Sequence, residues 1–266
     1  MRTRPFTLAV VALLGALALY LCVAAWLWNR SPTIAFDPVA QLQRDTPHAP
    51  DAERAWPAYR NALAWLRQLR LESQDYGEFQ AHLVATLDAV PGSPAWDRAA
   101  AMLSEHAHDI DALQQAAAMP VFGFAPSLQL TDADAAYFGA DAQPPSAEFA
   151  AEFPSLAIAL PYLQDMGGAL SVLRLQALQQ ALRGDGAGAV RALESMLHIG
   201  AHVAQMPVLI GSLVQYSAQV KAAETAVEAL ALQANAFKPA DLARLDALLA
   251  GVDANATRLN LAGERA

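Results

Sequence analysis

Residues 169–204 read ALSVLRLQALQQALRGDGAGAVRALESMLHIGAHVA, and this stretch decides the fold class. On either side of its Gly-Asp-Gly segment, apolar residues recur at spacings of three and four, as on one face of an amphipathic helix. Gly184 suits the left-handed position that ends one helix, and Asp185 can cap the start of the next. The stretch therefore predicts two antiparallel helices, Ala169–Arg183 and Ala187–Ala204.

The helical period continues on both sides of this hairpin. No segment shows the period-two alternation of a half-buried strand, so the predicted fold class is all-α. Further helices are expected to start between Glu53 and Trp56, to lie near Tyr76–Ala89, and to cover Pro94–Ala118, Val208–Gln233 and Pro239–Leu249. One more should begin at about Ser155 and be interrupted at Pro161 and at Gly167-Gly168, because proline and glycine disfavour a helix interior.

Residues 6–28 form the only uncharged run of the chain that is both long enough and apolar enough to cross a bilayer, because the uncharged run at 198–220 is broken by Pro207 and contains several Gln and Ser residues. As a helix, these 23 residues would span roughly 34 Å, slightly more than a hydrocarbon core of about 30 Å. Arg2 and Arg4 precede the run and place the short N-terminal tail in the cytoplasm under the positive-inside rule. We therefore predict that residues 1–30 are a single-pass anchor in a bacterial inner membrane, with the rest of the chain in the periplasm.

A cleaved signal peptide is the alternative for the same run. Signal peptides have apolar cores of about 7–15 residues, and this run is longer, which favours a permanent anchor. Cleavage stays open because Val23-Ala24-Ala25 offers the compact residues that a signal peptidase needs. The sole cysteine, Cys22, lies inside the run, so the chain cannot form an intramolecular disulfide.

The remainder of the chain divides into a linker and one helical domain. Residues 31–50 contain four prolines and few large apolar residues, which predicts an extended tether. Residues 51–266 are long enough for one sizeable core and include a Pro- and Gly-punctuated loop near 119–147. Its rings are Phe122, Phe124, Tyr137 and Phe138. We expect them to pack over the helices, and a ligand-binding lip is the alternative.

The charge balance outside the anchor is acidic. Three of the 17 Lys and Arg residues lie in the first 30 positions, which hold no Asp or Glu, so residues 31–266 carry 14 basic and 26 acidic side chains. There is no basic stripe to neutralise phosphates, which argues against nucleic acid as a partner. The same deficit argues against adhesion to anionic lipid headgroups.

Glu194, His198 and His202 are the best candidates for a metal site, because their spacing of four places a carboxylate and two imidazoles along one side of a helix. Placed at intervals of about 100°, however, they lie about 70°, 110° and 150° from the buried direction that apolar residues such as Val190 and Leu193 define. This drift from the core edge into solvent predicts a solvated flank without a bound metal. No cofactor is expected elsewhere.

Three other motifs are weaker. Residues 105–111 read EHAHDID, but these ligand-type side chains point around most of a helical turn. Asp132-x-Asp134 begins like a calcium loop and then lacks a third ligand and the glycine. Gly184-x-Gly186-x-x-Ala189 fits a dinucleotide fingerprint formally, yet it follows a helix where that motif requires a strand. The chain has no G-x-S-x-G nucleophile elbow.

The central hairpin resembles one tetratricopeptide-type repeat. Residues at the family's spacing are Gly184, Asp185, Ala189 and Leu193, whereas Gln180, Met196 and Ala201 depart from its pattern. No second turn occurs at a shift of about 34 residues, so tandem repetition is absent. The resemblance implies antiparallel helix packing and allows a binding face.

More broadly, the chain resembles uncharacterised, Ala- and Leu-rich helical proteins that bacteria export or anchor in the membrane. The similar parts are the Trp56-Pro57-Ala58-Tyr59 helix start, the Gly184-Asp185 hairpin, the helix after Pro207 and the closing Gly263-Glu264-Arg265-Ala266. Such proteins often continue beyond this closing stretch, which would make the chain a truncated form. The family carries no assigned activity, so the resemblance implies a fold and an envelope location but no site residues.

Two functional hypotheses follow. The favoured one is a membrane-anchored periplasmic helical protein that binds or scaffolds a protein or another envelope component, because the chain combines an anchor, helix hairpins and no familiar catalytic motif. The alternative is an envelope enzyme, such as a metal-assisted hydrolase that uses His106, His108, His198 or His202.

Overall fold

The computed structural model describes residues 38–71, 85–124, 130–139 and 160–252. Within these ranges every regular element is a helix, apart from one isolated β-bridge between Arg54 and Val121. The all-α fold class is therefore confirmed. All of the described residues belong to one compact unit, which begins at Asp37.

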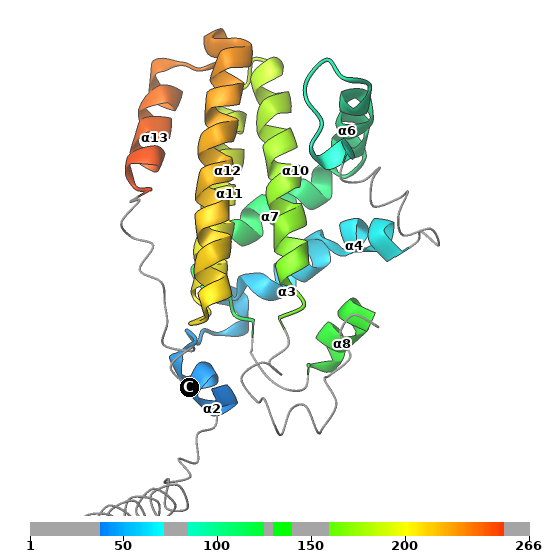
Figure 1. Ribbon diagram of the computed structural model, residues 1–266, viewed down its shortest axis with the longest axis vertical. Helices are drawn as coiled ribbons and strands as arrows, with labels where there is room; N and C mark the ends of the chain where they lie inside the picture. The colour runs from blue at the N-terminus through cyan, green and yellow to red at the C-terminus, as the bar shows by residue number, and fades with distance from the viewer. Residues whose placement is uncertain (1–37, 72–84, 125–129, 140–159, 253–266) are drawn as a thin grey trace, which may run out of the picture. The chain divides into compact units, whose positions relative to one another are not determined.

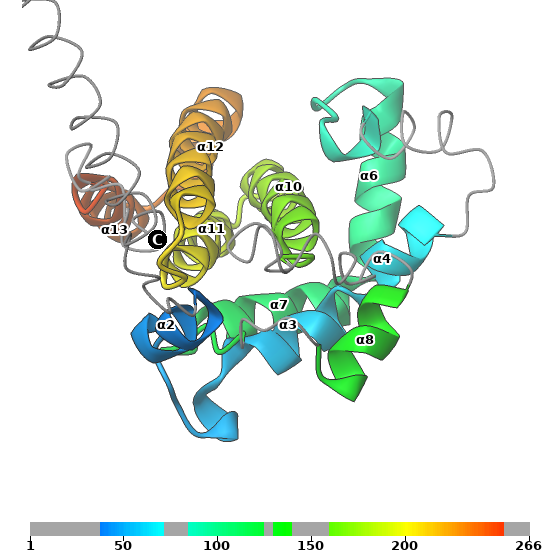
Figure 2. The ribbon, with the colours of Figure 1, turned by 60° about the horizontal axis from the view of Figure 1, so that its bottom comes forward.

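The long helices α10 (Leu163–Leu182), α11 (Gly186–Ala204) and α12 (Leu209–Gln233) lie alongside one another (Figure 1). Figure 2 shows α12 on the side of this group opposite α3 and α7. Helix α11 is central, because it packs against α10, α12, α7 and α13. The other helices are α2 (Pro38–Asp45), α3 (Ala55–Ala62), α4 (Ala64–Leu71), α6 (Pro94–Glu105), α7 (Ala107–Ala117), α8 (Asp132–Phe138) and α13 (Pro239–Ala250).

The α10–α11 hairpin is confirmed, although α10 begins six residues earlier than predicted, at Leu163. Gly184 has a φ of 80°, which is the left-handed conformation expected at the end of α10. The carboxylate of Asp185 accepts a hydrogen bond from the backbone N–H of Gly188 at 2.9 Å and caps α11. Gly186 carries no Cβ where the backbone of Ala236 passes, so the start of α11 can lie against the turn before α13.

Helix α10 is not interrupted at Gly167-Gly168, so this prediction is wrong. The helix begins after Pro161 and continues through both glycines. A Cβ on Gly168 would lie 2.8 Å from Cδ2 of Leu66, whereas a Cβ on Gly167 would have no atom within 4 Å. Gly168 therefore permits a close approach to α4, and the packing of α10 outweighs the low helix propensity of two glycines.

Replacing Gly167 by alanine should raise the free energy of unfolding by about 0.5–1 kcal/mol, because alanine loses less backbone entropy in a helix. Gly168→Ala is the matched control and should gain less or lose stability, since its Cβ meets Leu66. Urea unfolding of the two variants measures the difference. A loss at position 167 equal to that at 168 would contradict this account.

Three further predictions differ in part from the structure. Residues 94–118 form α6 and α7 with a break at His106, whose ring stacks on that of Trp65 with centroids 3.9 Å apart. Residues 31–50 are not extended throughout, because Pro38 opens α2 and Leu42 is buried. The 119–147 loop contains α8, which Thr131 caps by accepting a hydrogen bond from the backbone N–H of Asp134.

Three of the four aromatic rings of this segment are buried in the core and Tyr137 is half-buried against it, which confirms that they pack over the helices. Trp56 is at their centre: its ring stacks on Phe138 with centroids 5.6 Å apart and meets the edge of Phe124 at 5.2 Å. Phe122 and Phe124 also enclose Tyr162. The segment thus contributes a large part of the core around α3.

Several predictions concern residues that the structure does not describe. The anchor at residues 6–28, most of the helix near Tyr76–Ala89, the helix start at Ser155 and the closing 263–266 stretch lie outside the described ranges. Among the helices that the structure describes, none combines the length and the apolar character needed to cross a bilayer.

Candidate functional site

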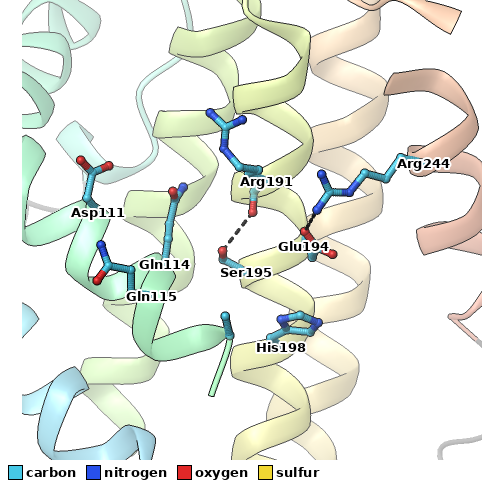
Figure 3. Close-up of a pocket in the computed structure, with 9 residues that line it drawn as sticks. Asp111, Gln114, Gln115, Arg191, Glu194, Ser195, His198 and Arg244 are labelled. Atoms are coloured by element: carbon cyan, nitrogen blue, oxygen red, sulfur yellow. Dashed lines mark hydrogen bonds and ion pairs between the residues drawn. The ribbon is translucent and has the colours of Figure 1, made fainter. Parts of the chain in front are cut away.

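A pocket of about 490 Å³, lined mainly by polar and charged residues, lies between α7, α11 and α13 (Figure 3). Its lining residues are Asp111, Gln114, Gln115, Ala118, Arg191, Glu194, Ser195, His198 and Arg244. Two of the predicted candidates, Glu194 and His198, are among them. The remaining polar residues of the pocket were not predicted as site residues.

The residues that line the pocket recur at the same intervals along two helices. Helix α7 contributes positions 111, 114 and 115 and is followed by Ala118 at its C-cap, and α11 contributes positions 191, 194, 195 and 198. Residues at i, i+3, i+4 and i+7 share one face of a helix, so each helix presents a single polar row. This repeated spacing is the signal in the sequence that could have identified the site. It marks a polar row on α11, a helix that is buried on most of its other faces.

The charges in the pocket balance. Arg244 of α13 forms an ion pair with Glu194 of α11, which ties the last helix to the central one. Arg191 lies 3.8 Å from the carboxylate of Asp185 and remains about half exposed. With His198 neutral, the lining carries two arginines against Glu194 and Asp111, so its formal charge is zero. This pocket suits a neutral or mixed-charge polar ligand better than a strongly charged one.

Several polar groups of the pocket are open to a ligand. Among the residues drawn in Figure 3, the hydroxyl of Ser195 donates to the backbone carbonyl of Arg191 at 2.9 Å, and Arg244 pairs with Glu194. Within the described residues, the side chains of Gln114, Gln115 and His198 form no hydrogen bond. Two amides and an imidazole can therefore both donate to and accept from a molecule in the pocket.

His202 does not join Glu194 and His198, and its predicted place in solvent is wrong. Its side chain is buried: Nδ1 lies 2.8 Å from the hydroxyl of Tyr59, and Nε2 lies 2.8 Å from the carbonyl oxygen of Met119. The buried side of α11 is set by Ala189, Ala192, Met196, Ile199 and Val203, whereas Ala201 is exposed. The buried side of α11 was predicted wrongly because the helix packs on several sides. Its many alanines and glycines also do not indicate which side faces the core.

The two partners of His202 determine its tautomer. A carbonyl oxygen only accepts, so Nε2 carries the hydrogen that is donated to Met119. In the neutral ring Nδ1 then accepts from the hydroxyl of Tyr59. Burial lowers the pKa of His202 below its ordinary value, while the bond to Met119 raises it and nearby His198 lowers it. A second proton on the ring would leave the buried hydroxyl hydrogen of Tyr59 without this acceptor.

The free energy of unfolding should fall as the pH drops from 7 to 5, because His202 binds its second ring proton at a higher pH in the unfolded chain than in the folded one. The contribution of His202 is complete above its unfolded pKa of about 6.5 and decreases at lower pH, by up to about 1.4 kcal/mol per pH unit, until the folded-state pKa is reached. His202→Gln should flatten this dependence, measured by urea unfolding at several pH values. His108→Gln, at an exposed position, is the control, and an equal effect of both changes would contradict the assignment.

The weaker metal motifs have structural roles. The Nδ1 of His106 lies 3.1 Å from the carboxylate of Asp109, and His108 is exposed. Asp134 accepts hydrogen bonds from the indole N–H of Trp56 at 2.7 Å and from Arg60 at 2.8 Å. Across the described ranges, no three His, Cys, Asp or Glu side chains gather as a metal-ion site would require.

In comparisons with protein-family models, curated proteins and solved structures, nothing matches this chain. What the pocket does is therefore inferred from its own residues.

Proposed function

We propose that the chain is a single-pass protein of a bacterial inner membrane whose periplasmic helical domain binds a segment of another protein. The uncharged run at residues 6–28 and the arginines before it support the anchor and its orientation. The pocket between α7, α11 and α13 is the proposed binding site. No nucleic acid is involved, because the domain is acidic.

The polar rows of α7 and α11 carry this proposal. Side-chain amides such as those of Gln114 and Gln115 offer one acceptor and two donors each, which matches the N–H and C=O groups of a peptide backbone. Arg191 is placed to meet a carboxylate of the bound segment, and Glu194 with Arg244 forms a charged edge. A peptide that is polar and of mixed charge fits a pocket whose own charges cancel.

The alternative of a metal-assisted hydrolase finds less support in the geometry. His106 packs on Trp65, His108 is exposed, His198 lines the pocket and His202 is buried beside Tyr59. These four imidazoles are thus placed in different surroundings. Within the described ranges, the four imidazoles do not meet at one reacting centre.

Chemical cross-linking in cells, followed by identification of the proteins attached to the full-length chain, tests the proposal. Ala118 is exposed and lines the pocket, so Ala118→Trp should fill the site without disturbing the core. The matched control is Ala101→Trp on α6, at an exposed position outside the lining. We expect a specific protein to be enriched over an anchor-only chain (residues 1–36), which ends before the helical domain. The recovery of this protein should fall about tenfold in the position 118 variant alone, which corresponds to about 1.4 kcal/mol of binding. Equal recovery with both variants would contradict the site.

A further inference from the structure

Helix α12 is apolar on two opposite sides. Its inner side packs on the neighbouring helices with small residues, namely Gly211, Ser212, Ala218, Ala222, Ala226 and Ala229. Its outer side carries large apolar residues in solvent: Leu213 is 46% exposed, Tyr216 52%, Val220 37% and Val227 67%. A surface helix normally has the reverse arrangement, with its large apolar residues toward the core.

Close packing explains the small residues on the inner side. A Cβ on Gly200 of α11 would lie 2.7 Å from the Cβ of Ala218, and one on Gly211 would lie 2.8 Å from the carbonyl oxygen of Val203. The backbones of α11 and α12 are thus too close for larger side chains between them. This packing gives no reason for large apolar residues on the opposite side, where water would favour polar ones.

The outer residues follow the spacing of a coiled-coil seam. Leu213, Tyr216, Val220, Ala223, Val227 and Leu230 are separated by three and four residues in alternation, which is the a and d pattern of a heptad. Ala223 is half-buried, and Leu230 is half-buried against the core at the end of this row. We call these six residues the α12 seam. Leu213, Val220 and Val227 occupy a, and two of these three residues are the β-branched valines that favour two-stranded coils at this position.

We propose that the α12 seam pairs in parallel with the α12 seam of a second copy of this chain. A seam with alternating spacings of three and four packs knobs into holes only against a helix with the same period, and a second α12 provides one. In a parallel pair, Glu224 at e lies opposite Gln219 at the preceding g of the partner copy, so a carboxylate faces an amide donor and no like charges meet.

The parallel direction follows from where the chain enters the domain, and this step, like the effective concentration considered below, rests on the proposed membrane anchor. Thr46, just after α2, contacts the sulfur of Met206 at 3.9 Å, so the N-terminal side of the domain lies near the start of α12. A parallel pair places both entry points at one end. An antiparallel pair would separate them by the length of α12, 25 residues or roughly 37 Å.

The expected pair is weak in dilute solution. A seam of this length buries several hundred Å² on each copy, less than the roughly 800 Å² per partner of a standard stable interface. Two copies held in one membrane meet at a high effective concentration, which compensates for a small contact. Pairing should therefore be measured on the full-length chain in membranes.

Site-specific cross-linking of the full-length chain tests this inference. In a Cys22→Ala background, Leu213→Cys alone and Val227→Cys alone should each give a covalent dimer with a short bismaleimide, because a parallel pair places identical residues opposite each other. Leu242→Cys, at an exposed apolar position on α13, is the control and should stay monomeric. Dimer only in mixtures of the position 213 and 227 variants would mean an antiparallel pair, and that result or no dimer would overturn the proposal.

A second variant separates pairing from folding. Val227→Lys adds a charge at the most exposed seam residue and should reduce the Leu213→Cys dimer about tenfold, while Leu242→Lys should leave it unchanged. Circular dichroism of both variants should show the same helix content. If no dimer forms but Ala118→Trp still abolishes recovery of the bound protein, only the pairing of α12 is contradicted. If the dimer forms but Ala118→Trp has no effect on recovery, only the proposed peptide pocket is contradicted.

Discussion

Replacing Trp56 by alanine is expected to lower the free energy of unfolding by about 3–5 kcal/mol, the range for removing a large aromatic from a closed core. Trp56 is 1% exposed, and the rings of Phe124 and Phe138 pack against it. Its indole N–H also donates to Asp134 at 2.7 Å. The substitution therefore leaves a cavity where α3 meets α8, and it removes one donor from a buried carboxylate.

Urea unfolding of purified protein measures this loss of stability. Two further variants show how much of it comes from the hydrogen bond and how much from the buried position of the ring. Trp56→Phe keeps most of the ring but not the donor, so it should cost less than half as much. Trp65→Ala removes the same residue type from a partly exposed position, where its ring stacks on His106. A cost at position 65 equal to that at position 56 would show that the cluster around Trp56 is not the centre of the core.

Replacing Asp165 by asparagine should lower the free energy of unfolding by about 3–5 kcal/mol, because it breaks a buried ion pair and leaves the partner charges in place. Asp165 is 1% exposed in the first turn of α10. One carboxylate oxygen pairs with Arg70, and the other lies 3.5 Å from Nη1 of Arg67, which is itself buried. Arg67 also donates to the carbonyl oxygen of Phe138, so the change affects α4, α8 and α10 together.

Asp246→Asn on α13 is the control for Asp165, because its carboxylate is exposed and should contribute within about 0.5 kcal/mol. A double variant with Arg67→Met and Asp165→Leu should recover part of the loss, since apolar residues can replace a buried pair. A cost below 1 kcal/mol for Asp165→Asn at neutral pH would contradict the role assigned to this carboxylate.

Local signals in the sequence were sufficient for the elements whose ends are set locally. Gly184 and Asp185 mark the hairpin because a left-handed glycine and a capping carboxylate act within a few residues of the turn. Pro239 occupies the first position of α13, where a proline is tolerated, and Gly251 follows its last residue without adopting a left-handed conformation. The period of three and four also predicted α12 to within one residue of its observed start.

Features that depend on distant contacts could not be predicted in this way. Gly168 lies inside a helix because Leu66, about a hundred positions earlier, fills the space beside it. Asp134 resembled a calcium ligand in sequence, yet it pairs with Trp56 and Arg60. His202 was assigned to solvent because a helical wheel cannot show that Tyr59 and Met119 cover that side of α11.

The pocket combines residues that a local pattern indicates with residues that only distant contacts bring together. Glu194 and His198 were noted as weak metal-site candidates from their spacing on one helix, and the structure places both in the lining of the pocket. Gln114 and Gln115 were not, because their row on α7 gains meaning only when α7 packs against α11. Arg244 reaches the site from α13, far along the chain, and no local pattern could place it there.

The most direct test of the proposed function is photo-cross-linking in cells from inside the pocket. A photoreactive phenylalanine analogue at Gln115 of the full-length chain should form an adduct with one protein, and the same analogue at Ala101 on α6 should not. Ala118→Trp should suppress the adduct from position 115. An adduct that forms equally from both positions, or none from position 115, would contradict a peptide-binding pocket between α7, α11 and α13.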